Sequence, residues 1–306
     1  MSQFAIATAA YPTNPSFVAD FVTGVAAASS GQGDVKLIVA AEYGFEAAAA
    51  LGRLPAGVML DLRPASKPMT PAGLRRVMVE AAVQSEAEIV VFADFDDRLL
   101  PEALDLHAEA LADAAISYGD MELIDEKGHS LGRRFYEGTG VPAHFIGNSA
   151  IADRNFIGFT NSAIRSANLK SEIPPIPDTV AAADWWFYTM ILASGVRANQ
   201  TRRKVTDYRV RRESIVGHTI SANPTVLRQR ALLALKHYAA LSDELQWRTR
   251  HEAIARLVAA IDQDATDGLI DIISEMANKP IVWFEDVGLA AARLFSAKSE
   301  IAKACL

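Results

Sequence analysis

Short apolar runs alternate along the first two thirds of the chain with stretches in which apolar residues recur every three or four positions. The runs are typical of buried strands, and the periodic stretches are typical of helices with one buried face. The expected strands span residues 4–10, 35–40, 57–62, 89–93 and 114–120, and the expected helices span residues 16–28, 73–85, 101–113 and 182–194. This alternation predicts an α/β fold with a mainly parallel, twisted sheet flanked by helices.

The pattern becomes wholly helical near residue 221. Candidate helices span residues 224–240, 242–262, 266–277 and 281–304. The change predicts two parts, a first domain over residues 1–220 and an all-helical C-terminal region over residues 221–306. One face of the first of these helices is expected to pack on the first domain or on a second subunit in a homodimer; it carries Leu227, Ala231, Leu235 and Tyr238. The last segment, from Ile281, is expected to pack into the core, with contact to a membrane surface as the alternative.

The apolar run at residues 89–93 stops at three acids, Asp94, Asp96 and Asp97. The carboxyl end of a buried parallel strand faces a ligand crevice. Asp94 and Asp96 are two residues apart, so both can reach one cation, and their oxygens suit Mg²⁺ or Mn²⁺ holding a diphosphate. Asp97 can bind the same ion through water or cap the next helix. Capping is the alternative for one acid, but three adjacent carboxylates repel each other unless positive charge lies among them.

Composition narrows the classes of function and the compartment. The chain of 306 residues is 50% hydrophobic and 22% charged, with a net charge of −7 that argues against a general nucleic-acid binder. The single cysteine, Cys305, cannot form an internal disulfide, which favours a reducing compartment. We find neither a signal-peptide pattern nor an apolar run of the roughly 20 residues that a transmembrane helix needs. We therefore expect a cytoplasmic protein without a transmembrane segment, and peripheral attachment to the inner membrane face stays open.

Five segments in chain order resemble the inverting glycosyltransferases of family 2, which have a GT-A fold. They are an Asp-x-Asp motif at residues 94–96, a strand and turn at residues 117–128, a segment at residues 155–162, an acidic motif at residues 184–186 and a Tyr-Arg-x-x-x-x-Ser segment at residues 208–214. The resemblance covers residues 4 to about 216. It implies a GT-A-like sheet and a metal-assisted enzyme that moves a sugar from a nucleoside-diphosphate donor to a hydroxyl acceptor with inversion.

The resemblance also implies a donor site and its cofactor. Asp94 and Asp96 would hold Mn²⁺ or Mg²⁺, and Asp94 would also contact the nucleotide sugar, for which a UDP-sugar is the expected choice. Tyr11 is what this chain keeps of the family's segment after the first strand, and Glu42 stands where the family has a base-binding acid. A glycan or another hydroxyl compound would be the acceptor.

Asp184 would take the proton from the acceptor hydroxyl, because burial beside Trp185 and Trp186 raises the pKa of a carboxyl toward the useful range. A helix cap is the alternative. One of the two tryptophans is expected to stack on a sugar and the other to lie in the core. Arg209 and Arg211, with Arg212, can neutralise phosphate charge. The alternative for this basic cluster, which includes residues 202–204, is a solvated loop.

The chain also departs from the family. The paired acid after the second strand is Ala40-Ala41-Glu42, the Glu-Asp pair is Ala183-Asp184, and the histidine of the late segment is Arg211. These losses motivate a second hypothesis, a catalytically silent GT-A-like protein that binds a glycan or a partner protein. A third hypothesis comes from the Asp-x-Asp spacing, which also resembles phosphatases of the haloacid dehalogenase superfamily. Against it, the motif lies mid-chain and is followed by Asp97-Arg98 instead of Gly-Thr.

Overall fold

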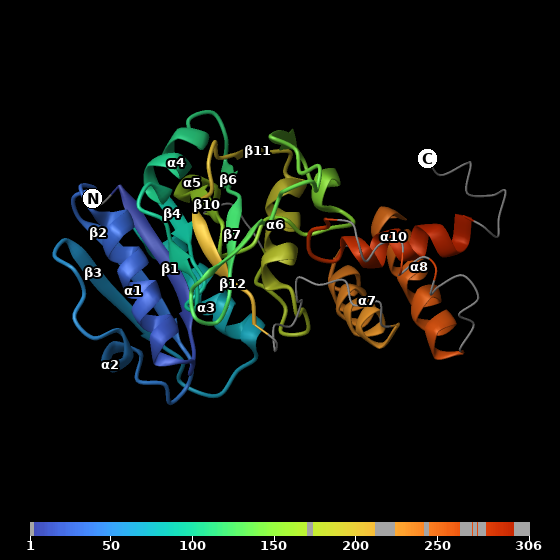
Figure 1. Cartoon of the computed structure of the whole chain (residues 1–306), viewed down its shortest axis with the longest axis horizontal. Helices are drawn as coiled ribbons and strands as arrows, with labels where there is room; N and C mark the ends of the chain where they lie inside the picture. Colours follow the sequence, from blue (N-terminus) through green and yellow to red (C-terminus); the bar gives the residue numbers. More distant parts are fainter. Residues whose placement is uncertain are drawn as a thin grey trace.

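The computed structural model describes residues 3–169, 174–211, 224–241, 245–263, 271, 274 and 280–296 (Figure 1). Its strands are β1 (Phe4–Ala10), β2 (Val35–Ala41), β3 (Val58–Pro64), β4 (Ile89–Phe92), β5 (Arg98–Leu99), β6 (Ile116–Tyr118), β7 (Met121–Ile124), β8 (Ser130–Arg134), β9 (His144–Ile146), β10 (Ser162–Arg165), β11 (Arg197–Gln200) and β12 (Thr206–Arg209). Its helices are α1 (Pro15–Ser29), α2 (Ala47–Leu51), α3 (Pro71–Gln84), α4 (Ala103–Ala110), the 3₁₀ turn η1 (Ser149–Ile151), α5 (Ser166–Leu169), α6 (Ala183–Ala193), α7 (Pro224–Ala239), α8 (Leu245–Asp262) and α10 (Glu285–Ser296).

The predicted α/β fold is confirmed. Within the described part of the chain, eight strands form one sheet in the order β3-β2-β1-β4-β10-β6-β11-β9. The first four are mutually parallel, with Phe4 of β1 in register with Val35 of β2 and Ile89 of β4. β10 runs antiparallel to β4 and β6, so the sheet is mixed and mostly parallel. Because β1, β2 and β4 are central and parallel, their carboxyl ends meet at one edge.

Helices cover both faces of the sheet, and β1 divides the core between them by alternation. Phe4 and Ile6 of β1 face a cluster with α1 and α4, whereas Ala5 and Ala7 face a cluster with α3 and α6. Since both faces are covered, every residue of β1 is buried, which explains why the strand is an uninterrupted apolar run in the sequence.

A second sheet, β5-β12-β7-β8, was not predicted. β5 has only two residues, too few to leave a periodic pattern in the sequence. β12 pairs with β7 in parallel and with β5 in antiparallel orientation, so Asp207 lies opposite Arg98. This pairing carries the end of β12 back beside the acidic loop that follows β4.

Two helix starts lie earlier than the apolar pattern suggested. α1 begins at Pro15, and its cap is Asn14, whose side chain accepts a hydrogen bond of 3.0 Å from the Ser16 backbone; the predicted cap at Ser16 is therefore wrong. α3 begins at Pro71 with Thr70 as its cap. In both cases a proline occupies the first turn, where its missing N–H costs no hydrogen bond and its fixed φ suits the helix.

The C-terminal helices pack against the first part of the chain, with α6 between them and the large sheet (Figure 1). The Tyr238 hydroxyl of α7 donates to the Ala152 carbonyl at 2.9 Å, and the Trp186 indole of α6 donates to the Ala240 carbonyl at 3.2 Å. Leu227, Ala231 and Tyr238 are buried as expected, and Leu235 is half-buried. The predicted packing on the first domain is confirmed, whereas the homodimer stays a prediction.

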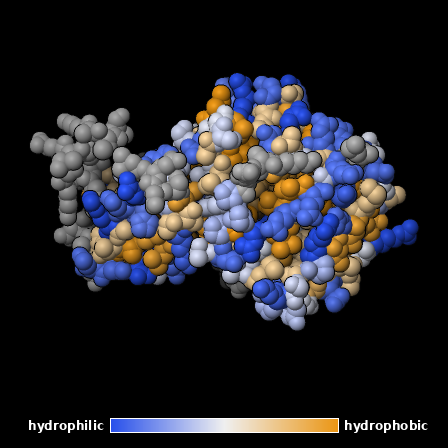
Figure 2. All heavy atoms as spheres, turned by 180° about the vertical axis from the view of Figure 1, so that it is seen from behind, coloured by the Kyte–Doolittle hydropathy of each residue, from blue (hydrophilic) through white to orange (hydrophobic). Residues whose placement is uncertain are grey.

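Several predictions concern residues outside the described ranges, namely the boundary at 220/221, residues 212–214, Cys305 and nearly all of the helix expected at 266–277. Among the described helices, none is both long and apolar enough to cross a bilayer. Val282 and Phe284 are each 2% exposed, so this part of the last segment packs against protein, as its core interpretation predicted. On the face shown in Figure 2, hydrophilic and hydrophobic residues are interspersed.

Candidate functional site

A cleft of about 460 Å³ lies at the edge where the carboxyl ends of β1, β2 and β4 meet. Those three strands lead to Tyr11, Glu42 and the acidic loop with Asp94. Most of the site residues expected from the sequence line this one cleft: Tyr11, Glu42, Asp94, Asp96, Asp184, Arg209 and Arg211. They come from positions that are far apart in sequence, and the sheet topology brings them together.

Two arginines lie among the acids at the end of β4. Arg75 Nη2 lies 3.0 Å from Asp94 Oδ1, and Arg211 Nη2 lies 3.0 Å from Asp96 Oδ2. The repulsion between adjacent carboxylates is therefore offset by two guanidinium groups of the protein itself. Each ion pair is only partly exposed to solvent, with Arg75 on α3 and Arg211 just after β12.

Tyr11 completes this charged group. It lies in the same cleft, and the charges of Asp96, Asp94 and Arg211 all act on its hydroxyl. Burial, followed by the charges of Asp96 and Asp94, raises the pKa of Tyr11 far above its usual value. The phenol therefore stays protonated and can donate a hydrogen bond at any pH at which the protein works. Burial and the neighbouring Asp94 likewise raise the pKa of Asp96.

Asp97 does not cap the next helix, which was one of the two roles expected for it from the sequence. One of its oxygens accepts from Thr160 Oγ1 at 2.5 Å and the other from the Arg209 backbone N–H at 2.7 Å. Burial and the charges of Asp96 and Asp94 raise its pKa. Asp97 thus joins the acidic loop to β12, and α4, which it was expected to cap, starts at Ala103 without a side-chain cap.

Arg209 also departs from its expected role. Its side chain is 0% exposed, and the guanidinium lies over the Phe17 ring, 4.4 Å from the centroid. The guanidinium donates to the Asp20 carboxylate at 2.5 Å. It also donates to the backbone carbonyls of Asp96 (2.9 Å), Asp125 (3.2 Å) and Glu126 (3.3 Å). With its donors engaged in this way, Arg209 supports the acidic loop, and Arg211 and Arg75 are the arginines that offer charge to a ligand in the cleft.

The basic loop at residues 202–204 matches its solvated alternative. Its three side chains form ion pairs outside the cleft, Arg202 with Glu109 (2.8 Å), Arg203 with Glu102 (3.0 Å) and Lys204 with Glu122 (3.1 Å). Pairs of this kind contribute little to stability. They are not among the cleft residues.

Asp184, at the start of α6, is a cleft carboxylate whose pKa is raised by its surroundings. Burial raises its pKa to about 6, and Arg75 is the largest influence in the opposite direction. Its Oδ1 accepts from the Trp185 backbone N–H at 2.8 Å, and the nearby Asn155 side chain also lowers its pKa. A carboxylate with this pKa can accept a proton at neutral pH and remains basic enough for the transfer to be useful.

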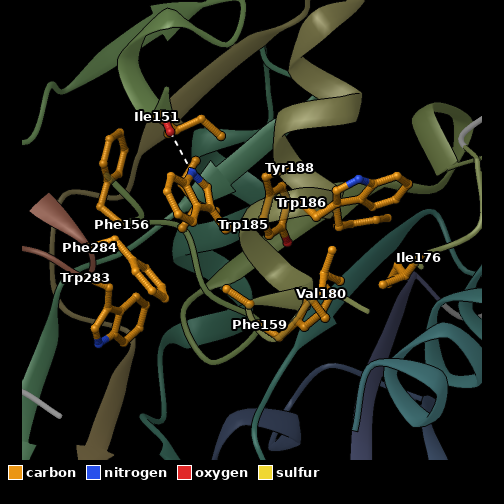
Figure 3. Close-up of a cluster of buried hydrophobic side chains, with 14 of the residues drawn as sticks. Ile151, Phe156, Phe159, Ile176, Val180, Trp185, Trp186, Tyr188, Trp283 and Phe284 are labelled. Atoms are coloured by element: carbon orange, nitrogen blue, oxygen red, sulfur yellow. Dashed lines mark hydrogen bonds between the residues drawn. The ribbon is translucent and has the colours of Figure 1, made fainter. Parts of the chain in front are cut away.

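Trp185 and Trp186 do not reach the cleft. They are 1% and 2% exposed, and neither is among the cleft residues. The Trp185 indole donates to the Ile151 carbonyl at 2.7 Å, drawn as a dashed line in Figure 3. Its ring stacks on His237 and on Phe284. Both tryptophans are core residues, and burial of each indole N–H is tolerated because a backbone carbonyl accepts its hydrogen bond. The expected sugar contact from this pair is therefore not supported.

Other cleft residues were missed by the sequence analysis, notably Arg75, Asn155, Trp283 and Phe284. The helix that carries Arg75 was predicted from the spacing of its apolar residues. That spacing did not indicate that the Arg75 side chain faces the cleft. Asn155 belongs to the segment that resembled the family's acceptor side. Trp283 and Phe284 precede α10 in the C-terminal region, and only the tertiary contacts bring them to the cleft.

The described residues include no group of three or more His, Cys, Asp or Glu side chains that could hold a metal ion by themselves. Asp94 and Asp96 nevertheless fit one common arrangement, in which Mg²⁺ or Mn²⁺ is bound by one or two carboxylates and completed by substrate phosphates and water. Both side chains line the cleft and are hard oxygen donors.

Comparison with known proteins agrees with this geometry at the level of the fold. No protein-family model and no curated protein matches the chain. Among solved structures it is similar to residues 1–349 of S. aureus TarS, with a TM-score of 0.55 and 15% identity over 97% of this chain and 93% of that one. A complex of the same TarS fragment with UDP-GlcNAc has a TM-score of 0.54 and 16% identity over 97% of this chain and 91% of that one.

A third similar structure is the mannosyltransferase PcManGT from Pyrobaculum calidifontis in complex with GDP-Man and Mn²⁺. It gives a TM-score of 0.50 and 14% identity over 99% of this chain and 77% of that chain. Identities this low show the fold alone. The chain therefore has a GT-A-like fold, the fold of nucleotide-sugar glycosyltransferases such as these.

Proposed function

We propose that this protein is an inverting glycosyltransferase of the family 2 type, which moves a hexosyl group from a UDP-sugar or another nucleoside-diphosphate sugar to an acceptor hydroxyl. The observation that carries the proposal is the shared cleft, where the group of Asp94, Asp96, Arg75 and Arg211 lies together with Asp184, the carboxylate whose pKa is about 6. The charged group can bind a diphosphate, and Asp184 can take the proton from an attacking hydroxyl.

On the donor side, Arg75 and Arg211 hydrogen-bond the diphosphate, and Tyr11 donates to one of its oxygens. Glu42, at the end of β2, contacts the nucleoside, as the order of the strand ends suggests. These groups place the anomeric carbon within the cleft and accept the growing charge on the leaving diphosphate. Asp94 and Asp96 would hold Mn²⁺ or Mg²⁺, which when bound adds Lewis-acid neutralisation of the diphosphate.

On the acceptor side, Asp184 removes the proton from the attacking hydroxyl. The oxygen of that hydroxyl forms a bond to the anomeric carbon as the bond from this carbon to the diphosphate oxygen breaks. The electron pair of the broken bond leaves with the diphosphate, and the proton remains on Asp184 until solvent takes it. Attack from the face opposite the leaving group inverts the anomeric configuration.

The domain assignment and location complete the proposal. Residues 1–220 carry the donor site, and residues 221–306 form the helical region, which adds Trp283 and Phe284 to the cleft. We further propose a cytoplasmic protein. Sedimentation tests for a homodimer through the C-terminal helices. Liposome flotation tests for peripheral contact with a membrane.

The test combines binding and turnover. Isothermal titration with UDP and Mn²⁺ is expected to show binding that Asp94→Ala and Asp96→Ala each weaken strongly, whereas Asp184→Asn leaves it near the wild-type value. In a screen of sugar nucleotides, Asp184→Asn is expected to lower transfer by a factor of about 10²–10⁴. UDP binding that ignores both Asp94→Ala and Asp96→Ala would count decisively against the proposal.

The same measurements judge the two other hypotheses. A catalytically silent protein would bind UDP or a glycan but release no sugar from any donor. A phosphatase would hydrolyse a generic phosphate ester in a reaction lost in Asp94→Asn. The GT-A-like fold supports the transferase over the phosphatase, and the raised pKa of Asp184 in the shared cleft supports it over the silent protein.

A further inference from the structure

Trp283 and Phe284, which we call the aromatic wall, belong to the C-terminal helical region and yet line the same cleft as Asp184. They are 8% and 2% exposed, so most of each ring is buried. Figure 3 shows Phe284 between Trp185 and Trp283. Trp283 lines the cleft and also packs on the core, with the Phe135 ring centroid at 4.5 Å.

The wall is adjacent to the proposed base. A Cβ atom placed on Gly158 would lie 2.9 Å from Cζ3 of Trp283 and 3.2 Å from Oδ2 of Asp184. Both groups thus lie within 3.2 Å of one point, an approach that a residue with a side chain would obstruct. Asn155 lies in the same neighbourhood, because its backbone N–H donates to the Trp283 carbonyl at 2.8 Å and its side chain lowers the pKa of Asp184.

Hydrogen bonds hold the wall rigidly before any ligand arrives. Glu285 is central to them, since one of its oxygens accepts from the Val282 backbone N–H at 3.0 Å and the other from Arg154 at 3.1 Å. On the next residue, Asp286 forms a buried ion pair of 2.5 Å with Arg230 of α7. A preorganised surface loses little conformational freedom when it binds a ligand.

The backbone at the wall is strained. Phe284 has φ of 65°, the left-handed region that residues other than glycine rarely adopt. Such a conformation persists only where the surrounding contacts over-determine it, and it tends to occur at functional sites. Here it makes the sharp turn between Trp283 and the start of α10 at Glu285 and so keeps both aromatic rings at the cleft.

We propose that the aromatic wall is the acceptor subsite and that the acceptor is a glycan, whose terminal sugar ring stacks on Trp283 with one hydroxyl directed at Asp184. This rests on the proposed transferase function. A pyranose has a flat face of C–H groups that matches an aromatic ring, and its hydroxyls point outward to polar groups such as Asn155. An open-chain polyol offers no rigid face to the indole.

The test measures acceptor and donor binding separately. The wild-type protein, Trp283→Phe and Trp283→Leu are titrated with methyl pyranosides of the common hexoses and with glycerol, all in the presence of UDP and Mn²⁺. Binding is followed by calorimetry and by intrinsic tryptophan fluorescence. Trp247→Leu is the matched control, because Trp247 is a buried tryptophan of α8 that stacks on Tyr238 away from the cleft.

We expect at least one pyranoside to bind the wild type, with the dissociation constant about tenfold weaker in Trp283→Leu and less weakened in Trp283→Phe. Affinity for UDP should match the wild type in both variants, which also shows that they fold, and Trp247→Leu should keep the affinity for the pyranoside. Three results would overturn the proposal: no pyranoside binds, glycerol binds as well as the pyranosides, or Trp283→Leu binds them like the wild type. Failure of the wild type to bind UDP would instead remove the transferase function, and this subsite with it.

Discussion

The Arg75 guanidinium lies 3.0 Å from the Asp94 carboxylate, and the same positive charge opposes the rise in the pKa of Asp184 that burial causes. One arginine on α3 thus acts on the charge of both halves of the proposed site. Loss of Arg75 should remove the ion pair of Asp94 and raise the pKa of Asp184, although neither acid lies on the same element as Arg75.

The first prediction concerns pH. Replacing Arg75 with Met removes a charge that lowers the pKa of Asp184, so that pKa should rise above about 6. Because transfer needs the ionised carboxylate, kcat/KM should begin to fall at a higher pH than in the wild type as the solution is acidified. Arg76→Met is the control, since Arg76 pairs with Asp178 at 3.1 Å and does not line the cleft. Superimposable acid limbs for Arg75→Met and wild type would refute the coupling.

The second prediction concerns Gly158. In Gly158→Ala the new methyl group would meet the Trp283 ring at 2.9 Å and Asp184 Oδ2 at 3.2 Å, closer than normal packing allows. One of the two groups must move, and misplacement of a catalytic group by about 1 Å can cost about 10²-fold in rate. We expect kcat to fall by one to two orders of magnitude while UDP affinity, measured by calorimetry, is retained. A variant with wild-type kcat would show that the geometry around Asp184 tolerates change.

The third prediction separates two arginines that are two residues apart. Arg209→Met leaves Asp20 and several backbone carbonyls without their donor, so the free energy of unfolding in urea should fall by about 2–4 kcal/mol. Arg211→Met removes an ion pair in which the arginine side chain is 32% exposed but Asp96 is buried, so it should cost less than Arg209→Met, about 1–2 kcal/mol. Affinity for UDP should fall about tenfold in Arg211→Met, because a charge-assisted contact with phosphate is lost. If Arg211→Met destabilises the fold as much as Arg209→Met, the division of roles between them is wrong.

The fourth prediction concerns His237 of α7, which stacks on Trp185 with ring centroids 3.8 Å apart. Neither ring nitrogen has a hydrogen-bond partner among the residues that the structure describes, and burial lowers the pKa of His237 to about 3. His237→Phe keeps a stacked ring and removes the cost of burying unpaired polar atoms. It should therefore raise the free energy of unfolding at neutral pH by about 1–2 kcal/mol.

The sign of its pH dependence follows from linkage. Between about 6.5 and 3 the unfolded chain binds a proton at His237 that the folded chain does not, so acidification through this range favours unfolding of the wild type. The stability difference in favour of His237→Phe should widen as pH falls from 6.5. Urea titrations at a series of pH values measure it, and a constant difference would show that His237 takes up its proton in the folded state.

Much of the site could be predicted because of where residues stand relative to strands. An apolar run that ends in Asp94 and Asp96 indicates a buried strand and a crevice at its end, and parallel topology then places Tyr11 and Glu42 at the same edge. Asp184 was singled out because it stands where the acidic motif of family 2 glycosyltransferases would lie; without that resemblance, a helix cap was the expected role. The acidic loop needs only local periodicity and the rule that parallel strand ends converge, whereas the roles expected for Tyr11, Glu42 and Asp184 came from the resemblance.

The sequence did not show which way a side chain faces or which residues it contacts. Trp185 and Trp186 carry the same chemistry as Trp283, but the packing of α6 against α7 and α10 turns the first pair into the core and the last toward the cleft. Arg209 and Arg211 are both basic, and only the pairing of β12 with β5 and β7 shows which of them is enclosed.

The order of apolar and polar residues thus determined the element types, the α/β class and the carboxylates at the strand ends, because those depend on contacts between near neighbours in the chain. Contacts between distant segments decided which side chains face the cleft: they brought Arg75 to Asp94, enclosed Arg209 and carried Trp283 beside Asp184. A side chain's exposure is set by what packs against it, and the packing residue can lie as far away in the sequence as Asp20 lies from Arg209, 189 positions.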